Sequence, residues 1–275
     1  MYLSRIYSSI FLLFFLLLCL KSSLFFKIFF IHILSFFAIW EYLRIIKLSK
    51  KRINNINYLD LNLTRIRLKI SDYLVLFFFQ LYLLLNNNSF FIVSSFVIML
   101  IILLIFYFSN KKRFKYAFGL FYIFFPFFFF NEVIDDNYLF FLIITFTVTI
   151  STDVGAYIVG KTIGGSKIAP TLSPNKTWAG FFGGILATLL ISNFIFQNNS
   201  SIFFGILFFL IASIVCQLGD ITESALKRSF NIKDSGSLIP GHGGILDRLD
   251  SFFTLILFIM SLYFLNFDFS SLFVL

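Results

Sequence analysis

The sequence predicts an all-α fold, a polytopic integral membrane protein with about nine transmembrane helices. Three observations support this fold class. The composition is 59% hydrophobic and only 13% charged, whereas a soluble domain is about half apolar and a quarter charged. Apolar runs long enough to cross a bilayer recur along the whole chain. The polar stretches between these runs alternate between basic and non-basic, as loops on the two sides of a membrane do.

The apolar runs define the expected helices in order, because a helix that crosses the hydrocarbon core needs about 20 apolar residues. Spans are expected at 6–20, 22–40, 72–86, 89–109, 116–131, 138–160, 179–196, 201–219 and 251–267. The first, third and fifth runs are short, so eight spans or a re-entrant segment are alternatives. The first run has no small-residue cleavage site, which favours a retained membrane anchor over a removed signal peptide.

Alternate gaps between these runs collect the basic residues. With a cytoplasmic N-terminus, all of the 22 Lys and Arg residues except Lys21 and Lys27 fall on the cytoplasmic side. The positive-inside rule therefore accounts for the net charge of +9, and no nucleic-acid partner is expected. A multi-pass protein of a bacterial inner membrane, surrounded by the lipid bilayer, fits this arrangement.

Two regions are expected from the distribution of ionisable residues. Residues 1–130 form N-terminal transmembrane helices with a basic cytoplasmic loop at 41–71. That loop has room for one interfacial helix, and its charges either meet anionic headgroups or act only as an orientation signal. Residues 131–275 form a C-terminal transmembrane region in which carboxylates lie within or beside the spans. The chemistry is expected in this second region.

Carboxylates at the ends of two spans are the first candidates. Asp153 lies near the end of 138–160, where an unpaired charge costs roughly 2.5–3.5 kcal/mol. It has either a functional role or a structural ion pair with a neighbouring helix. Asp220, Glu223, Ser224 and Lys227 follow at spacings that share one helix face. The alternative for this second group is a set of simple i,i+4 pairs on a solvated surface.

The stretch PGHGGILDRLD at 240–250 is the most concentrated polar feature. Asp247 and Asp250 are expected on one face of a helix that enters the last span. The glycines let backbone N–H groups approach phosphate oxygens. Carboxylates grouped with bases and glycines suit Mg²⁺ together with phosphates, because Mg²⁺ takes one or two carboxylates and substrate oxygens. His242 is either a metal ligand or a hydrogen-bond partner of a phosphate or of the backbone.

Basic and hydroxyl side chains complement that stretch. They come from the segment 224–250 and from a second polar loop at 164–180 on the same predicted side of the membrane. Such side chains bind phosphate oxygens. The candidates are Lys167, Ser173, Lys176, Thr177, Lys227, Arg228, Lys233 and Arg248.

Residues 224–250, SALKRSFNIKDSGSLIPGHGGILDRLD, resemble the signature of the phosphatidate cytidylyltransferases (CDP-diacylglycerol synthases). This segment is called the signature segment below. TDVGAY at 152–157 and LSPNKTWAG at 172–180 resemble other blocks of that family. Ala179 departs from the pattern, since many members have Glu there. The resemblance covers about 151–251, and the first 130 residues are similar only in hydrophobic layout.

The resemblance implies a nucleotidyltransferase that converts CTP and phosphatidate to CDP-diacylglycerol and diphosphate in phospholipid biosynthesis, with its active site facing the cytoplasm. It implies Mg²⁺ bound by Asp220 and Asp247, with Asp250 and Asp153 as second choices, and K⁺ as a second cation. Asp250 and Asp153 would orient ligands or hold Lys227. A homodimer is compatible with the family. The implied catalytic residues are Asp220, Asp247, Lys227, Arg228 and Asp250. The implied phosphate-binding residues are Lys176, Thr177, Ser224, Lys233, His242, Gly243, Gly244 and Arg248.

A transporter or channel is the chief alternative, because Asp153 and Asp220 near bilayer depth could form a cation pathway. The clustering of polar residues on one predicted side disfavours it. A CTP-dependent lipid kinase, or a cytidylyltransferase for another lipid phosphate, is a further alternative. CTP-dependent conversion of labelled phosphatidate would separate these functions.

Overall fold

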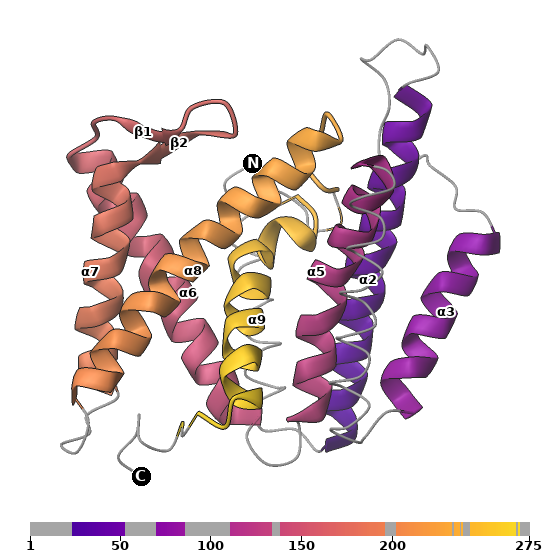
Figure 1. Cartoon of the computed structure of the whole chain (residues 1–275), viewed down its shortest axis with the longest axis horizontal. Coiled ribbons are helices and arrows are strands. Elements are labelled where there is room, and N and C mark those ends of the chain that lie inside the picture. Colours follow the sequence, from indigo (N-terminus) through magenta and orange to yellow (C-terminus); the bar gives the residue numbers. More distant parts are fainter. Residues whose placement is uncertain are drawn as a thin grey trace. The chain divides into compact units, whose positions relative to one another are not determined.

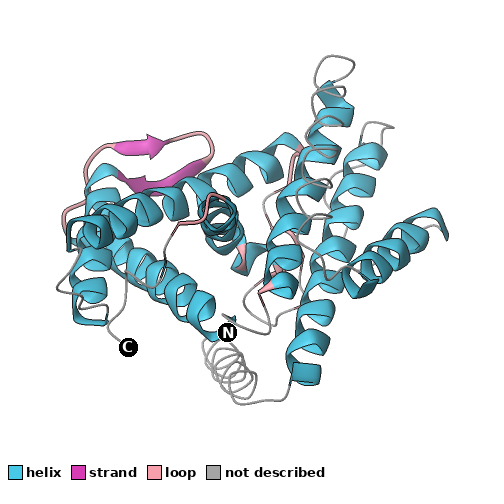
Figure 2. Cartoon of the chain, turned by 60° about the horizontal axis from the view of Figure 1, so that its bottom comes forward, coloured by secondary structure: helices cyan, strands magenta, loops and turns pink. Residues whose placement is uncertain are grey.

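The structure is a computed structural model that describes residues 24–52, 70–85, 111–133, 138–195, 202–232, 234–236, 238, 243–267 and 269. In these ranges the regular secondary structure is helical apart from one small two-stranded sheet, and loops and turns join these elements (Figures 1 and 2). The chain divides into two compact units, each described below by itself. The first unit comprises Met1–Tyr138 and Leu226–Leu249, and the second comprises Leu139–Ala225 and Asp250–Leu275.

Helix α2 (Leu24–Arg52) is central to the first unit and packs against α5 (Lys111–Glu132) and α3 (Ile70–Leu85). Tyr42 fixes the contact between α2 and α5. Its hydroxyl donates to the carbonyl of Lys115 at 2.9 Å, and its ring lies over Gly119. A Cβ at Gly119 would come within 2.0 Å of the Tyr42 oxygen. The absence of a side chain at that position therefore permits the close approach of the two helices.

Polar side chains join α2 to α3. Gln80 of α3 lies 2.6 Å from Nδ1 of His32 and donates to Oγ of Ser35 at 2.9 Å. Lys47 and Asp72 form an ion pair between the same two helices. Hydrogen bonds between helices stabilise packing where lipid supplies no competing partners.

The second unit contains α6 (Tyr138–Thr162, in this unit from Leu139), α7 (Trp178–Ile195), α8 (Ile202–Ser229) and α9 (Asp250–Phe264). A hairpin of β1 (Lys167–Ala169) and β2 (Ser173–Thr177) connects α6 to α7. The strands are antiparallel, and Lys167 pairs with Thr177. Helix α8 continues past the end of this unit, because its residues from Leu226 belong to the first unit.

Small residues bring α6 and α7 together. A Cβ at Gly155 would lie 2.4 Å from that of Ala187, and one at Gly183 would lie 2.4 Å from Cβ of Val159. Beside this seam, the buried hydroxyls of Thr152 and Thr188 lie 2.8 Å apart. Close backbone approach combined with buried hydroxyl pairs is typical of helices that associate inside a membrane.

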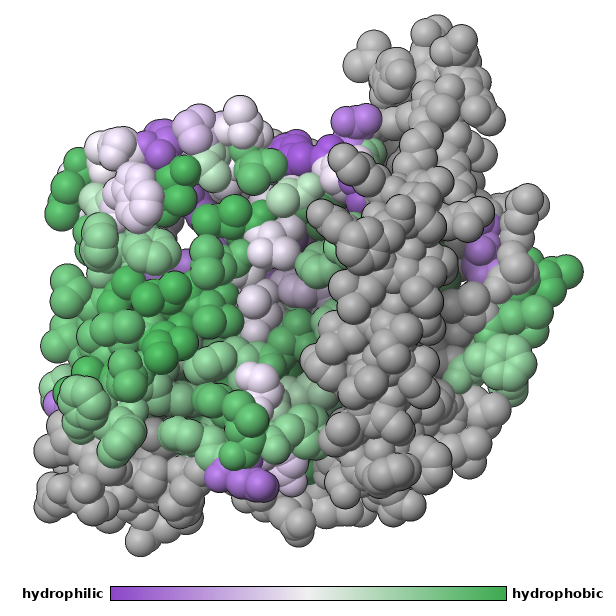
Figure 3. All heavy atoms as spheres, in the orientation of Figure 1, coloured by the Kyte–Doolittle hydropathy of each residue, from purple (hydrophilic) through white to green (hydrophobic). Residues whose placement is uncertain are grey.

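The outward faces of the second unit are apolar. On α7 the side chains of Phe182, Leu186, Leu190 and Phe194 recur every fourth residue and are 57–78% exposed. Figure 3 shows this hydrophobic surface on the helices below the hairpin. A stripe of this size on one helix indicates a lipid-facing surface.

Among the described residues, three helices are long and apolar enough to cross a membrane: Phe26–Lys47, Phe140–Thr162 and Phe203–Ser229. Shorter apolar helices occupy Phe114–Phe130, Trp178–Phe194 and Asp250–Phe264. The chain is therefore a helical membrane protein. The predicted runs at 6–20 and 89–109 lie outside the described residues, and each of the others overlaps a helix.

Three elements differ from the prediction. Helix α2 does not end at residue 40 but runs through Arg52, so the first part of the expected 41–71 loop is helical. Helix α8 runs ten residues past the expected end at 219, because the polar residues that follow keep good helix propensity. The expected polar loop at 164–180 contains the β1–β2 hairpin and, from Trp178, the first turn of α7.

Candidate active site

The last turn of α8 directs the signature segment back toward α2. The N–H of Ile232 donates to the carbonyl of Lys227 at 3.1 Å, and Asn231 adopts a positive φ of 57°. This is the left-handed conformation that commonly ends a helix. Phe230 is buried and stacks on Tyr116 of α5 with ring centroids 5.8 Å apart. The chain reversal therefore places residues 234–236 within the first unit.

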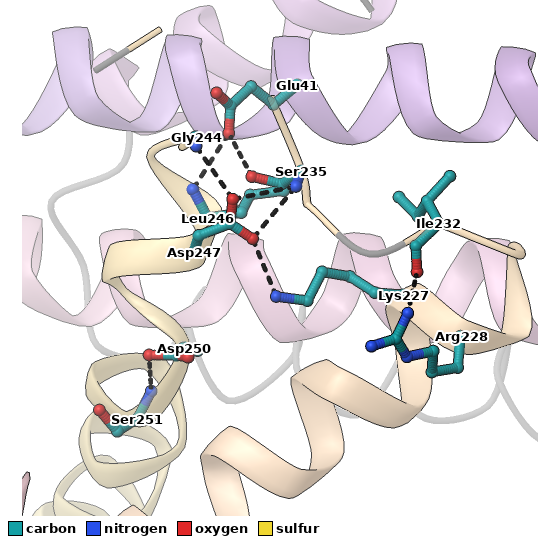
Figure 4. Close-up of polar contacts among 10 residues, drawn as sticks. All are labelled: Glu41, Lys227, Arg228, Ile232, Ser235, Gly244, Leu246, Asp247, Asp250 and Ser251. Carbon is teal, nitrogen blue, oxygen red and sulfur yellow. Dashed lines mark hydrogen bonds and ion pairs between the residues drawn. The ribbon is translucent and has the colours of Figure 1, made fainter. Parts of the chain in front are cut away.

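Asp247 gathers three parts of the signature segment around one carboxylate. Nζ of Lys227 donates to Oδ1 at 2.8 Å. The N–H of Ser235 donates to both oxygens, at 3.1 and 3.0 Å, and the N–H of Gly244 donates to Oδ2 at 2.9 Å (Figure 4). The Asp247 side chain is 11% exposed. A carboxylate with this many donors is held in a single orientation.

Glycine is required at position 243 for this arrangement. Gly243 has a φ of +86°, and a Cβ there would lie 2.7 Å from Oδ2 of Asp247. An L-amino acid with a side chain would strain the backbone and displace the carboxylate. The N–H of Gly244 donates to Asp247 in this structure, and its role toward a substrate phosphate stays a prediction.

A second lysine–carboxylate pair lies in the second unit. Lys176 of β2 and Asp220 of α8 form an ion pair between side chains that are 28% and 17% exposed. The hairpin therefore lies at the C-terminal end of the α8 portion in this unit. The start of α9 lies at the same end, because a Cβ at Gly219 would be 2.3 Å from Oγ1 of Thr254 and 3.2 Å from the carbonyl oxygen of Asp250.

Thr177 has a structural role next to that pair. It immediately precedes α7, and its Oγ1 accepts a hydrogen bond from the N–H of Gly180 at 3.1 Å. This is the geometry of an N-terminal cap, in which a side-chain oxygen satisfies a backbone donor of the first turn. The residue is 4% exposed. The cap accounts for Thr177 without a ligand.

Three carboxylates of the second unit act electrostatically on one buried thiol. The group is Cys216 of α8, and the carboxylates are those of Asp153, Asp220 and Asp250. They come from α6, from α8 and from the first residue of α9. Asp250 also accepts a hydrogen bond from the N–H of Ser251 at 2.8 Å. Three carboxylates from three helices of this unit therefore lie near Cys216.

Three of the remaining predicted residues are described. Arg228 and Arg248 are exposed, and Nη1 of Arg228 reaches the carbonyl of Ile232 at 3.5 Å. Ser224 is half-buried on α8. Lys233 and His242 lie outside the described residues.

One prediction about these carboxylates is wrong. Asp247 and Asp250 do not share one helix, because Leu246–Arg248 forms a 3-10 turn and α9 begins at Asp250. Leu249 between them has φ −111° and ψ 11°, which breaks the helical run. Lys227 donates to Asp247, and the expectation that Asp250 and Asp153 orient ligands or hold Lys227 stays a prediction.

The sequence interpretation missed Glu41 of α2 and Ser235. Glu41 accepts hydrogen bonds from the hydroxyl of Ser235 and from the N–H of Leu246, both at 3.1 Å. The sequence did show an acidic residue directly after the apolar run 22–40. Because the helix was predicted to end at residue 40, Glu41 was placed in the following loop. Nothing in the local sequence points to partners about 200 positions further along the chain.

The donor set fits Mg²⁺ only with the help of substrate oxygens. Within the described part of the chain, no group of three or more His, Cys, Asp or Glu side chains could hold a metal ion. Mg²⁺ usually takes one or two carboxylates and completes its octahedron with water and substrate phosphates. Within each unit one carboxylate is available to such a metal: Asp220 lies beside Lys176 in the second unit, and Asp247 lies beside Lys227 in the first.

The structure is that of a helical membrane protein with lysine–carboxylate pairs at the ends of apolar helices. The family model described as "Cytidylyltransferase family" matches residues 3–266. The chain belongs to that family.

Individual relatives point in the same direction. The chain is 52% identical over 120 residues to the phosphatidate cytidylyltransferase of Bacillus subtilis, which is 42% of this chain and 43% of that protein. It is 47% identical over 115 residues to the Staphylococcus haemolyticus protein of that name, 41% of this chain and 44% of the relative. It is 44% identical over 136 residues to the Staphylococcus aureus phosphatidate cytidylyltransferase, which is 48% of this chain and 51% of that protein. The match thus spans about half the length of these relatives.

Proposed function

We propose that the chain is a phosphatidate cytidylyltransferase, which converts CTP and phosphatidate to CDP-diacylglycerol and diphosphate in phospholipid biosynthesis. Membership of the cytidylyltransferase family and the similarity to three proteins of that name support the proposal. The observation that carries it is the Asp247 cluster, in which one carboxylate orders Lys227 and two backbone segments. This cluster is built from the residues of the signature segment.

The proposed reaction needs no nucleophile from the protein. An ionised phosphate oxygen of phosphatidate attacks the α-phosphorus of CTP, and a new P–O bond forms. The bond from the α-phosphorus to the oxygen that bridges to the β-phosphorus breaks, and its electrons leave with diphosphate. The chain must bring two polyanions together and stabilise the charge that develops on the leaving group.

Cationic side chains of the site reduce that repulsion in the proposal. Lys176 and Lys227 each carry a carboxylate partner in the free chain. Arg228 and Arg248 are exposed, so their guanidinium groups are accessible to phosphates. Lys233, His242 and Ser224 are retained as proposed phosphate-binding residues.

Asp220 and Asp247 are the residues proposed to hold Mg²⁺, with Asp250 and Asp153 as second choices. A bound Mg²⁺ would supply positive charge to the phosphates and the leaving group. The lysine beside each carboxylate balances its charge in the free chain and becomes available to phosphate oxygens when the carboxylate binds a cation. K⁺ is proposed as a second cation.

The proposed setting is a bacterial inner membrane crossed about nine times, with the N-terminus in the cytoplasm. Residues 1–130 would supply N-terminal spans and 131–275 the catalytic region. The polar end of the second unit, which carries Lys176 and Asp220, would face the cytoplasm, where CTP is available. A homodimer is proposed as the assembly.

The direct test is conversion of radiolabelled phosphatidate by the purified chain in detergent micelles. CDP-diacylglycerol formed only when CTP and Mg²⁺ are both present is the expected result. Formation of a phosphorylated lipid and CDP would indicate a lipid kinase, and turnover only with another lipid phosphate would indicate a different acceptor. Cation flux in liposomes without any CTP turnover would indicate the transporter alternative.

A further inference from the structure

Glu41 is a buried carboxylate that the proposed reaction leaves without a role. It lies on α2 within the candidate span Phe26–Lys47 and is 2% exposed. Its Oε2 accepts from the hydroxyl of Ser235 and from the N–H of Leu246, both at 3.1 Å (Figure 4). A carboxylate in a membrane helix is costly and marks a functional position by default.

Two glycines of the signature segment make room for this side chain. A Cβ at Gly236 would lie 2.7 Å from Oε1 of Glu41, and one at Gly244 would lie 2.0 Å from Oγ of Ser235 and 2.5 Å from Oε2 of Glu41. Neither glycine has a positive φ, so backbone conformation does not require glycine there. What these positions require is space for the Glu41 carboxylate and, at Gly244, for the Ser235 hydroxyl as well.

Glu41 and Asp247 bind the same two segments of the chain. In the first segment, Ser235 donates its hydroxyl hydrogen bond to Glu41 and its N–H to Asp247. In the second segment, the N–H of Gly244 donates to Asp247, and the N–H of Leu246 donates to Glu41. The position of the Asp247 carboxylate therefore depends on a side chain of α2.

We propose that Glu41 is a positioning residue, through which α2 fixes the Asp247 carboxylate for catalysis. The effect of Glu41 on catalysis rests on the proposed function. The hydrogen bonds of Glu41 to Ser235 and Leu246 do not depend on it. Oε1 makes no hydrogen bond within the structure as described, although the atom is buried. If the side chain at position 41 only filled space, an apolar residue would give a more stable protein, because a buried oxygen without a hydrogen bond is destabilising.

The first experiment compares Glu41→Ala and Glu41→Gln in the full chain in nanodiscs. Gln keeps an oxygen that can accept from the N–H of Leu246, and its amide can donate to the Ser235 hydroxyl. Hydrogen exchange of the peptide that contains Gly244 and Leu246 should accelerate roughly 10- to 100-fold in Glu41→Ala, as expected for loss of a hydrogen bond to a charged group. Glu41→Gln should stay close to the unsubstituted chain.

Turnover provides the second measurement. In Glu41→Ala, kcat for CTP-dependent conversion should fall roughly 10-fold or more, while KM for CTP stays within about twofold. Glu41→Gln should restore most of kcat. Equal losses of kcat in both variants, or a rise in KM alone, would contradict a positioning role.

Gly236→Ala tests the same contact without removing the carboxylate. The three nearest atoms to its new methyl group all belong to Glu41. Alone, the substitution should lower kcat. Combined with Glu41→Ala it should have little further effect, because the carboxylate that the methyl group would displace is then absent. Gly205→Ala is the matched control, since a Cβ there meets nothing within 4 Å.

The outcomes separate the two proposals. Unchanged hydrogen exchange in a folded Glu41→Ala chain, or additive effects of Gly236→Ala and Glu41→Ala, would overturn the role of Glu41. An unsubstituted chain without CTP turnover, but with the expected exchange result, would overturn the proposed function and the catalytic part of this inference while the hold on the loop stands.

Discussion

Nζ of Lys227 lies 2.8 Å from Oδ1 of Asp247, across 20 residues of sequence. The pair joins the last turn of α8 to the 3-10 turn Leu246–Arg248. Lys227 and Asp247, near the two ends of the signature segment, are therefore joined directly. A change at either residue should alter the contacts that Ser235 and Gly244 make with the same carboxylate.

Asp247→Ala should abolish most turnover. The substitution removes the acceptor of Lys227, of Ser235 N–H and of Gly244 N–H at once. We expect kcat/KM to fall on the order of 100-fold or more, as when a preorganised electrostatic group is lost from an active site. Labelled phosphatidate and CTP provide the assay. Activity within a few-fold of the unsubstituted chain would contradict the role proposed for this carboxylate.

Asp220→Asn should change the dependence on divalent cation. The amide keeps the shape of the side chain but removes the charge that Lys176 and the proposed Mg²⁺ share. Chelation with EDTA should stop turnover of the unsubstituted chain, and Mg²⁺ should restore it. In the variant, the Mg²⁺ concentration for half-maximal rate should rise about tenfold or more, because a neutral ligand binds Mg²⁺ less well. An unchanged Mg²⁺ titration would argue that Asp220 does not bind the metal.

Thr177→Ala distinguishes a cap from a phosphate ligand. Loss of the hydrogen bond to Gly180 N–H should lower stability by about 1 kcal/mol, measured as a reduced thermal midpoint in detergent. Thr177→Ser retains the oxygen and should restore the midpoint. Because the cap explains this residue, KM for CTP should not change in either variant. A raised KM at unchanged stability would instead support direct phosphate binding.

Gly155→Ala should destabilise the second unit. The new methyl group would lie 2.4 Å from Cβ of Ala187 and 2.6 Å from the carbonyl oxygen of Gly183. Forcing a group into such a contact costs roughly 1–3 kcal/mol. Gly205→Ala on α8 is the control, because it introduces the same group where no atom lies within 4 Å. Equal thermal midpoints for both variants would show that α6 and α7 are not held by this seam.

The helices could be predicted from the sequence because length and apolarity of a run are local properties. The shared face of Asp220 and Lys227 was likewise readable, since both lie on the continuous helix α8. Helix ends were less accurate. Helix α2 carries Arg44 into its buried surface, and the sequence had placed that residue in a loop because Lys and Arg usually mark the end of a span.

The partners within the site could not be predicted, because they depend on where the chain reverses. Asn231 with its positive φ turns the signature segment toward α2, and Leu249 separates Asp247 from α9. Asn231 carries a local signal, because Asn adopts a positive φ more readily than most residues, but that signal does not say toward which helix the chain turns, and Leu249 carries none. As a result the contact of Lys227 with Asp247 and that of Glu41 with Leu246 were not foreseen.

The contact of α6 with α7 also limits how a lipid can approach. Where Gly155 faces Ala187 and Gly183 faces Val159, the two helices touch through backbone and single methyl groups. No fatty-acyl tail fits between the two helices along that line. Under the proposed function, the acyl chains of phosphatidate would therefore lie outside the α6–α7 contact, and altering their length should leave that contact undisturbed.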